Sequence, residues 1–222
     1  MPLSHLPRPR AIAFDLDGTL IDSRADIAAT CNHVLTWAGR PPLPESTIAT
    51  FVGDGARTLL ARAFALAGDA SELTSLLEEF NRYYAAHPVA RTRWMTGARE
   101  ALDAAHAAGI LAAVVTNKSR QATLPILDAL GVRARFAAIS AGGDGPLKPS
   151  AEPVLAVMRA MGTSAAETWV VGDGVQDIGA ARAAGCVAIA VMGGFHDEAK
   201  LRAMKPDALL TSLEELRAVF GP

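Results

Sequence analysis

The sequence is poor in cysteine, in aromatic residues and in excess charge of either sign. Its two cysteines, Cys31 and Cys186, are far apart, which excludes a disulfide-rich scaffold, and both are expected to be reduced and buried. Aromatic residues make up 5% of the chain, too few for a platform on which nucleic-acid bases stack. The net charge of -2 argues against a protein that depends on attraction to a phosphate backbone. We therefore expect a small-molecule partner and no nucleic acid.

Long hydrophobic runs are also missing. Apolar runs such as that at 110–115 are far too short to cross a bilayer, and residues 1–10 contain no apolar stretch like that of a signal peptide. These features predict a cytoplasmic protein without a membrane partner. Hydrophobic residues at 50% and charged residues at 20% are an ordinary globular mixture, and 222 residues are enough for one domain of roughly 150 residues and a further part.

Short apolar runs recur along the chain and alternate with helical stretches. Each run is continuously apolar, as in strands buried on both faces of a parallel sheet. We predict strands at 11–14, 110–115, 169–171, 187–191 and 208–210. Alanine-rich stretches predict helices at 97–108, 120–130, 151–161, 177–184 and 212–220, and several of these stop at a glycine. The alternation predicts an α/β fold with a Rossmann-like, doubly wound parallel sheet.

One long segment departs from this alternation. Residues 23–90 contain no convincing buried strand, only helical stretches at 26–37, 56–67 and 71–86 and a proline-rich loop at 41–44. A helical insertion thus separates the first strand from the second. We expect two domains: an α/β core formed by residues 1–22 and 92–222, and a helical cap domain formed by residues 23–91.

Polar residues follow the predicted strands where each strand ends, and ligands of open α/β sheets bind beyond these carboxyl ends. They are Asp15 and Asp17 after the first strand, Thr116 and Asn117 after the second, and Asp173 and Asp177 after the strand at 169–171. A single aspartate at such a place is usually a helix cap or a turn residue. Four at one edge repel one another unless a cation or protons lie between them. Oxygen ligands without a nearby His or Cys indicate Mg²⁺ rather than zinc.

Four segments at these positions resemble, in order, the signature motifs of the haloacid dehalogenase-like (HAD) superfamily of phosphotransferases. The first is Asp15–Leu20 (DLDGTL), the second Val114–Lys118 (VVTNK), the third Lys148–Pro149 and the fourth Gly172–Asp177 (GDGVQD). The resemblance spans nearly the whole chain. The helical insertion falls where this superfamily has its smaller, C1-type cap.

The resemblance implies roles for the two aspartates of the first motif. Asp15 would be the nucleophile that attacks phosphorus and forms an aspartyl-phosphate, which water then hydrolyses. Asp17 would protonate the leaving oxygen and later activate the water. Dehalogenases of this superfamily lack the second aspartate, so its presence favours phosphate chemistry.

The resemblance also implies residues that bind the phosphoryl group. Thr116 and the backbone of Asn117 would donate hydrogen bonds to its oxygens, and Gly18 would lie against it. Lys148 would neutralise charge on the phosphoryl group and on Asp15.

The resemblance implies that the four aspartates together also bind Mg²⁺. Asp15, the carbonyl group of Asp17, and Asp173 would be ligands, while Asp177 would hold a metal-bound water or position Lys148. The metal ion would offset the repulsion between an anionic nucleophile and an anionic substrate.

The insertion contains one glycine-rich segment, Phe51–Arg57 (FVGDGAR), which opens a predicted helix. Its backbone amides and the positive end of the helix dipole can face an anion. With the second motif and residues 142–144, this segment most resembles the bacterial phosphoglycolate phosphatase family. That resemblance implies a small anionic phosphomonoester, 2-phosphoglycolate, as substrate, with Gly53, Gly55 and Arg57 as binding residues and Arg57 near its carboxylate.

The core motifs leave other functions open. A phosphatase for a sugar or amino-sugar phosphate, a pyrophosphatase and a phosphotransferase of the β-phosphoglucomutase type share them. A non-catalytic binding or scaffold protein would have lost at least one key residue, whereas Asp15, Asp17, Lys148 and Asp173 are all present. The five histidines show no HxxxH spacing and are expected to be structural or exposed. A monomer or homodimer is expected.

Overall fold

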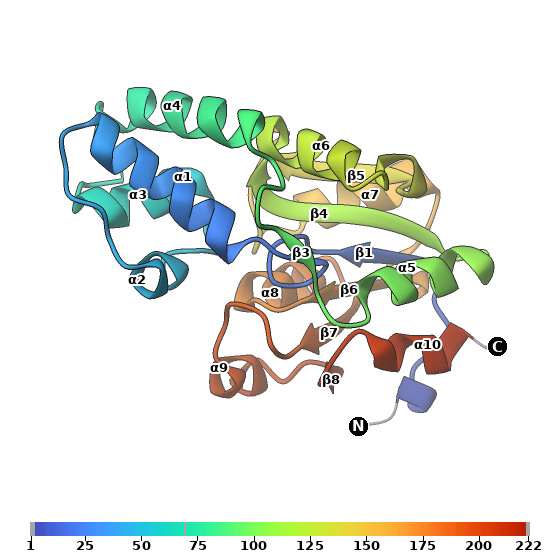
Figure 1. Ribbon diagram of the computed structural model, residues 1–222. Coiled ribbons are helices and arrows are strands. Elements are labelled where there is room, and N and C mark those ends of the chain that lie inside the picture. Colours follow the sequence, from blue (N-terminus) through green and yellow to red (C-terminus); the bar gives the residue numbers. More distant parts are fainter. Residues whose placement is uncertain (1–2, 69, 221–222) are drawn as a thin grey trace.

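The structure, a computed structural model, describes residues 3–68 and 70–220. It consists of a central sheet with helices on both faces and a group of helices beyond one end of its strands (Figure 1). Six strands form the sheet in the order β5-β4-β1-β6-β7-β8, and all neighbouring pairs are parallel. The strands are β1 (Ala11–Phe14), β4 (Leu111–Ser119), β5 (Ala138–Gly142), β6 (Thr168–Gly172), β7 (Val187–Val191) and β8 (Ala208–Leu210). This confirms the doubly wound α/β fold, since β1 lies inside the sheet and later strands extend it on both sides.

Five of these strands occupy the predicted positions, and one was not predicted. β1, β7 and β8 have the predicted bounds, whereas β4 continues past residue 115 to Ser119. β5 lacks the apolar run that predicts a buried strand, because its residues, AISAG, include a single large apolar side chain. Backbone pairing with β4 places it in the sheet, and a pattern of apolar residues does not reveal such pairing.

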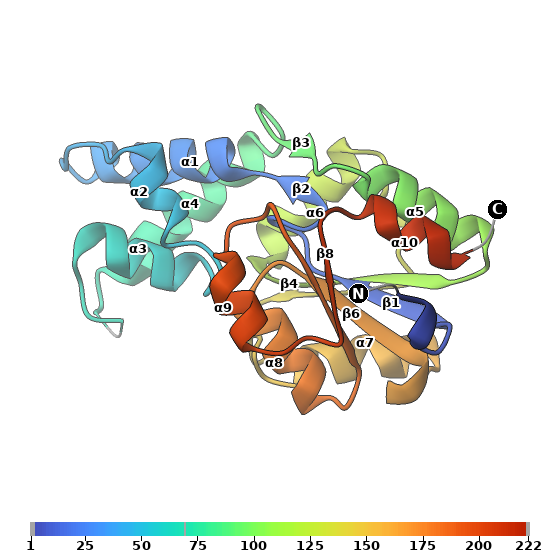
Figure 2. The same cartoon turned by 90° about the horizontal axis from the view of Figure 1, so that it is seen from below.

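β1 shows how the two faces of the sheet are covered. Ile12 and Phe14 belong to one buried hydrophobic cluster, and Ala11 and Ala13 to a second on the opposite face. The first face is covered by α5 (Ala98–Ala107), α6 (Arg120–Ala129) and α10 (Glu214–Phe220). The second is covered by α7 (Glu152–Met161), α8 (Val175–Ala183) and α9 (Glu198–Ala203), of which α9 was not predicted. Figure 2 shows the two layers on either side of the strands.

The helices of the core end where glycines allow the chain to turn. The glycines that follow α5, α6, α7 and α8 all have positive φ, as expected at helix C-termini. They are Gly109, Gly131, Gly162 and Gly185. Their left-handed conformations return the chain to the next strand with short connections.

In the described part of the chain, four helices lie between the first and second strands of the large sheet, and we call them the inserted helices. They are α1 (Arg24–Trp37), α2 (Glu45–Ala49), α3 (Ala56–Phe64) and α4 (Leu73–Ala86), of which the five-residue α2 was not predicted. The chain leaves the core through β2 (Ile21–Asp22) and returns through β3 (Arg93–Trp94), which pair antiparallel. The inserted helices pack on one another, and α4 also packs against α6.

The expected division into two domains stays a prediction at its boundaries of 22/23 and 91/92. Residues 1–2, 69 and 221–222 of that division lie outside the described residues. Within the described ranges, no helix is both long and apolar enough to cross a membrane.

Candidate active site

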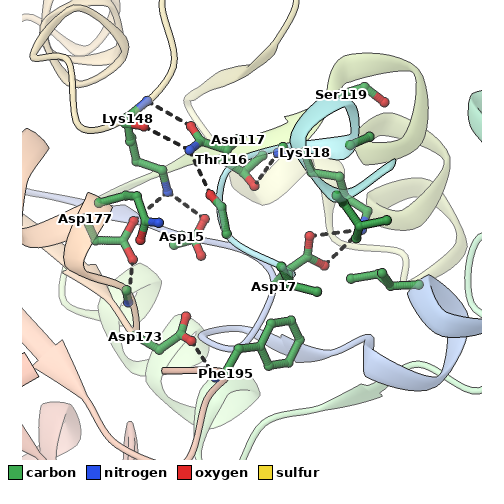
Figure 3. Close-up of a pocket in the computed structure, with 18 of the residues that line it drawn as sticks. Asp15, Asp17, Thr116, Asn117, Lys118, Ser119, Lys148, Asp173, Asp177 and Phe195 are labelled. Atoms are coloured by element: carbon green, nitrogen blue, oxygen red, sulfur yellow. Dashed lines mark hydrogen bonds and ion pairs between the residues drawn. The ribbon is translucent and has the colours of Figure 1, made fainter. Parts of the chain in front are cut away.

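A pocket lies between the carboxyl ends of β1, β4 and β6 and the inserted helices. Its sheet side is polar and contains most of the residues that the sequence motifs single out (Figure 3). Its other side is largely apolar, where Ile27, Val52, Leu59 and Phe80 line it. The topology thus gathers residues from four distant segments of the chain at one edge of the sheet.

Lys148 lies at the centre of the polar side. Its Nζ is 2.7 Å from Asp15 Oδ1 and 2.6 Å from Asp177 Oδ1, and it donates to the carbonyl oxygen of Val115 at 2.5 Å. The side chain is 3% exposed, so these three partners use the three donors of the ammonium group. Lys148 therefore holds the two carboxylates in fixed positions (Figure 3).

Three buried carboxylates form an acidic cluster around this lysine. Asp15, Asp173 and Asp177 each offer an oxygen, and the three oxygens lie within 4.8 Å of one another. Burial, which is the largest cause, and the neighbouring carboxylates together raise the pKa of Asp15 to about 8, against the lowering effect of the Lys148 ammonium. Burial also raises the pKa of Asp177. One ammonium cannot offset three negative charges, and this set of hard oxygen donors fits a divalent metal ion.

Asp173 is held by hydrogen bonds from two loops, the one that follows β1 and the one that follows β7. Thr19 Oγ1 donates to Asp173 Oδ1 at 2.9 Å, and the backbone N–H of Phe195 donates to Oδ2 at 2.7 Å. Gly18 has a φ of +88°, and a Cβ atom there would overlap the Asp173 carboxylate. A glycine is required at position 18 both by its conformation and by this close approach.

Asp17 has different partners from those of Asp15. Lys118 Nζ lies 3.0 and 2.9 Å from its two oxygens, and Ser23 Oγ donates to Asp17 Oδ1 at 2.5 Å. Asp17 lines the same pocket as Asp15, yet its side chain lies apart from the cluster around Lys148 (Figure 3). The two aspartates of the first motif are thus held by two different lysines.

Thr116 and Asn117 follow the apolar part of β4. Asn117 Nδ2 donates to the carbonyl oxygens of Lys148 at 3.0 Å and of Gly53 at 2.9 Å, and its Oδ1 accepts from the backbone N–H of Lys148 at 2.8 Å. The Asn117 side chain therefore ties the end of β4 to the Lys148 loop and to the insertion. Thr116 lines the pocket, and its Oγ1 accepts from the backbone N–H of Lys118 at 3.2 Å.

The structure brings Gly53 and Gly55 to the pocket but not Arg57. Both glycines line the pocket at the start of α3. Arg57 is exposed, and its guanidinium group donates to the backbone carbonyl oxygens of Gly68 and Ala70 at 2.9 and 3.4 Å. The expectation that Arg57 lies near a substrate carboxylate therefore does not agree with this geometry, because the first turn of α3 directs the side chain away from the pocket.

Several residues that line the pocket were not predicted from the sequence. Lys118 and Gln176 lie inside the second and fourth motifs but were given no role, whereas Phe195 and His196 lie in the loop after β7 and carry no sequence signal. His196 Nδ1 is 3.6 Å from Asp173 Oδ2, and this contact raises its pKa. The expectation that the histidines are structural or exposed does not describe His196, because it lines the pocket.

Hydrogen bonds hold the inserted helices over the pocket. Gln176 Nε2 donates to Asp54 Oδ1 at 2.7 Å, and Ser119 Oγ donates to Asn81 Oδ1 at 2.7 Å. With the contact from Asn117 to Gly53, they join the insertion to the end of β4 and to the first turn of α8. The inserted helices therefore cover the pocket, and hydrogen bonds hold them there both from β4 and from α8.

Comparison with known proteins agrees with the fold and with the motifs. A model of the family described as haloacid dehalogenase-like hydrolase matches residues 12–191. The chain is 38% identical to a phosphoglycolate phosphatase of Chromobacterium violaceum over 97% of both chains. It is 36% identical to a phosphoglycolate phosphatase of Agrobacterium fabrum over 94% of this chain and 90% of that one. A crystal structure described as a predicted phosphoglycolate phosphatase of Haemophilus somnus matches with a TM-score of 0.87 at 28% identity, covering 97% of this chain and 99% of the other.

Proposed function

Because the chain belongs to the haloacid dehalogenase-like hydrolase family, we propose that it hydrolyses 2-phosphoglycolate to glycolate and phosphate. The family and the relatives identify it as a phosphoric monoester hydrolase. The choice of substrate rests on one observation, the shared name of relatives that match nearly the whole chain. The match includes the inserted helices that form one side of the pocket, where the non-phosphate part of a substrate is bound.

In the first step, a carboxylate oxygen of Asp15 attacks phosphorus, and the bond between phosphorus and the ester oxygen breaks. The departing glycolate oxygen takes its proton from the carboxyl group of Asp17, and Asp15 becomes an aspartyl-phosphate. Lys148, 2.7 Å from Asp15 Oδ1, supports this step because its charge lowers the pKa of Asp15, which burial raises. Lys148 thus favours the carboxylate form that attacks, but the pKa of Asp15 stays raised, and a metal ion held by Asp15 would favour that form further.

In the second step, a water molecule attacks the phosphorus of the aspartyl-phosphate. Asp17, now a carboxylate, takes a proton from this water, and the bond between phosphorus and Asp15 breaks. The two steps together consume one water and release one alcohol and one phosphate. Thr116 and the backbone N–H of Asn117 would bind phosphoryl oxygens throughout, since donors fixed in a buried site stabilise the charge that develops there.

The donor set favours Mg²⁺ as the metal ion. Asp15, Asp173 and Asp177 would hold it through carboxylate oxygens, with the backbone carbonyl of Asp17 as a further ligand. When bound, such an ion offsets the repulsion between the anionic nucleophile and the phosphate dianion. Asp177 is oriented by Lys148 and by the backbone N–H of Gly174, which donates to Asp177 Oδ2 at 2.9 Å.

The proposal is tested by phosphate release from a panel of phosphates. The panel contains 2-phosphoglycolate, hexose and amino-sugar phosphates, nucleoside monophosphates and pyrophosphate, each with Mg²⁺ and with EDTA. We expect selective turnover of 2-phosphoglycolate that EDTA abolishes and added Mg²⁺ restores. Asp15→Asn should lower kcat by about 10³-fold or more, because the nucleophile is removed.

Asp128→Asn is the matched control, because Asp128 is exposed and pairs with Arg133. This variant should keep the wild-type rate. Selective turnover of a sugar phosphate or of pyrophosphate would contradict the assignment of 2-phosphoglycolate as substrate but would agree with the proposed mechanism. Full activity of Asp15→Asn, once mass spectrometry has excluded deamidation, would overturn the nucleophile.

A further inference from the structure

A second buried lysine, Lys118, lies in the pocket and has no part in the mechanism above. Its Nζ is 3.0 and 2.9 Å from the two oxygens of Asp17 and 4.2 Å from the ring centroid of Tyr84. The Lys118 side chain is 7% exposed and that of Asp17 is 12% exposed. Lys118 belongs to β4 and Tyr84 to α4, so the ammonium group lies where the sheet meets the inserted helices.

The contacts of Lys118 keep its charge in place. Burial by itself lowers the pKa of Lys118, but Asp17 and Tyr84 together outweigh that effect and the pKa is raised. The fully buried Tyr84 ring adds a cation–π contact, which is stronger away from water. In return, a carboxylate that is contacted at both oxygens cannot rotate freely. The orientation of Asp17 is thus set by Lys118 and by Ser23.

The other cations near the pocket cannot replace Lys118. Lys148 uses its three donors on Asp15, Asp177 and a backbone carbonyl. Arg57 is exposed and bound to backbone carbonyl groups of the insertion. Of the lysine and arginine side chains that line the pocket in the described residues, Lys118 is the one that contacts Asp17.

We propose that Lys118 is a positioning residue, which aligns the Asp17 carboxyl group with the leaving oxygen of the substrate. This inference rests on the proposed function, in which Asp17 takes a proton from the attacking water in one turnover and gives it to the leaving oxygen in the next as the phosphorus–oxygen bond breaks. The ring of Tyr84, which belongs to α4, holds Lys118 in place. Asp17 is therefore aligned when the inserted helices, α4 among them, lie over the pocket. Lys118 contacts Asp17 and acts on the reaction through it.

This role predicts a dependence on the leaving group. A poor leaving group needs a proton when its bond to phosphorus breaks, whereas 4-nitrophenolate leaves readily as an anion. A misaligned Asp17 therefore slows the reaction of poor leaving groups selectively. A lysine that only stabilised the fold would lower all rates by one factor.

The experiment measures kcat/KM of wild type and Lys118→Met for ethyl phosphate and for phenyl phosphates with graded substituents. The ratio kcat/KM is used because it reports the steps up to departure of the leaving group. General acids contribute about 10²–10⁴-fold, so we expect a loss of about 100-fold for ethyl phosphate and about 3-fold for 4-nitrophenyl phosphate. Lys200→Met is the matched control, because Lys200 is exposed on α9.

A double-mutant cycle with Asp17→Asn on phenyl phosphate shows whether Lys118 acts through Asp17. We expect Lys118→Met to cost less than about 3-fold in the Asp17→Asn background, because no acid is left to align. An equal loss in both backgrounds, or an equal loss across the phenyl phosphates, overturns the inference. So does a loss confined to carboxylate-bearing substrates, which would make Lys118 a substrate-binding residue. Absence of turnover of every phosphomonoester by wild type overturns the proposed function instead.

A second variant tests the inference if Lys118→Met does not fold. Tyr84→Leu keeps Lys118 and Asp17 and removes the ring beside the ammonium group. We expect the same dependence on the leaving group with a smaller loss, about 5-fold for ethyl phosphate, because the general acid contribution is only partly lost while Lys118 still contacts Asp17. A uniform loss for this variant would contradict the proposal.

Discussion

At the scale of single residues, Glu79 shows how partners determine the charge of a carboxyl group. It lies on α4, where Arg82 donates to both of its oxygens at 2.8 and 2.6 Å and His33 Nε2 lies 2.5 Å from Oε1. The Arg82 hydrogen bonds, then that of His33, lower the pKa of Glu79 from 4.5 to about 2. The ionised form is thus favoured in the folded state, and the contacts join α1 to α4.

This pKa predicts how stability changes with pH. The unfolded chain binds a proton at Glu79 near pH 4.5 and the folded chain only near pH 2, so the contribution is full above pH 4.5 and is lost as pH falls towards 2. Glu79→Gln lacks this contribution. We expect its urea-unfolding free energy to lie below wild type at neutral pH and to fall less steeply between pH 4.5 and 2. Parallel curves for the two proteins would contradict this.

Some residues of the pocket can be identified from the sequence and others cannot. Asp15, Asp17, Lys148 and Asp173 stand in recognisable motifs, and the structure places all four at one pocket. Their catalytic and metal-binding roles stay predictions until they are tested. Phe195, whose backbone N–H binds Asp173, could not be identified, because any residue can supply a backbone donor.

At the scale of secondary-structure elements, Asp26 joins the two connections between the sheet and the inserted helices. It lies in the first turn of α1 and is 4% exposed. Its oxygens accept from the backbone N–H groups of Arg91 and Thr92 at 2.8–3.0 Å and from Thr92 Oγ1 at 2.7 Å. The outgoing and returning segments are therefore tied together just beside β2 and β3.

We expect Asp26→Ala to destabilise the protein by about 2 kcal/mol, because the buried Asp26 carboxylate is lost and the partly buried N–H groups of Arg91 and Thr92 are left without their acceptor. Proteolysis in the segment 88–92 should become faster, since that segment loses its contacts to α1. Thermal unfolding and timed digestion measure the two effects. Asp128→Ala, which removes an exposed ion pair, should change stability by less than about 0.5 kcal/mol. Equal effects of the two substitutions would show that Asp26 does not join the connections.

At the scale of the whole molecule, one hydrophobic cluster runs through the sheet and the inserted helices. It contains Ile12 and Phe14 of β1 together with Ile27, Leu59 and Phe80 of the insertion. Burial of apolar surface is the main favourable term in folding, so the two parts of the molecule stabilise each other. The second cluster, under α7 and α8, is confined to the sheet and its helices.

The shared cluster predicts that the insertion and the sheet unfold together. Native-state hydrogen exchange measures this, because the most protected amides of each element report the free energy of the opening that exposes them. We expect those of α4 and β6 to agree within about 1 kcal/mol. A much lower value for α4 would mean that the insertion unfolds by itself while the sheet remains folded.

The sequence alone was sufficient for the α/β class, five of the six strands of the large sheet, the inserted helices α1, α3 and α4, and the residues of the four motifs. Continuous apolar runs and motif spacing are local properties, so they can be recognised without knowledge of long-range contacts. The same reasoning failed for β5, which has few large apolar residues, and for the short helices α2 and α9, because these depend on what lies beside them.

Only the tertiary structure decided which side chains meet. It paired Lys148 with Asp15 and Lys118 with Asp17, and it directed Arg57 to the carbonyl groups of Gly68 and Ala70 instead of the pocket. These outcomes depend on strand order, on the rotation of α3 and on the packing of α4 against the end of β4. The sequence around a charged side chain does not identify its partner, because the two residues lie far apart in the sequence and meet only in the folded chain.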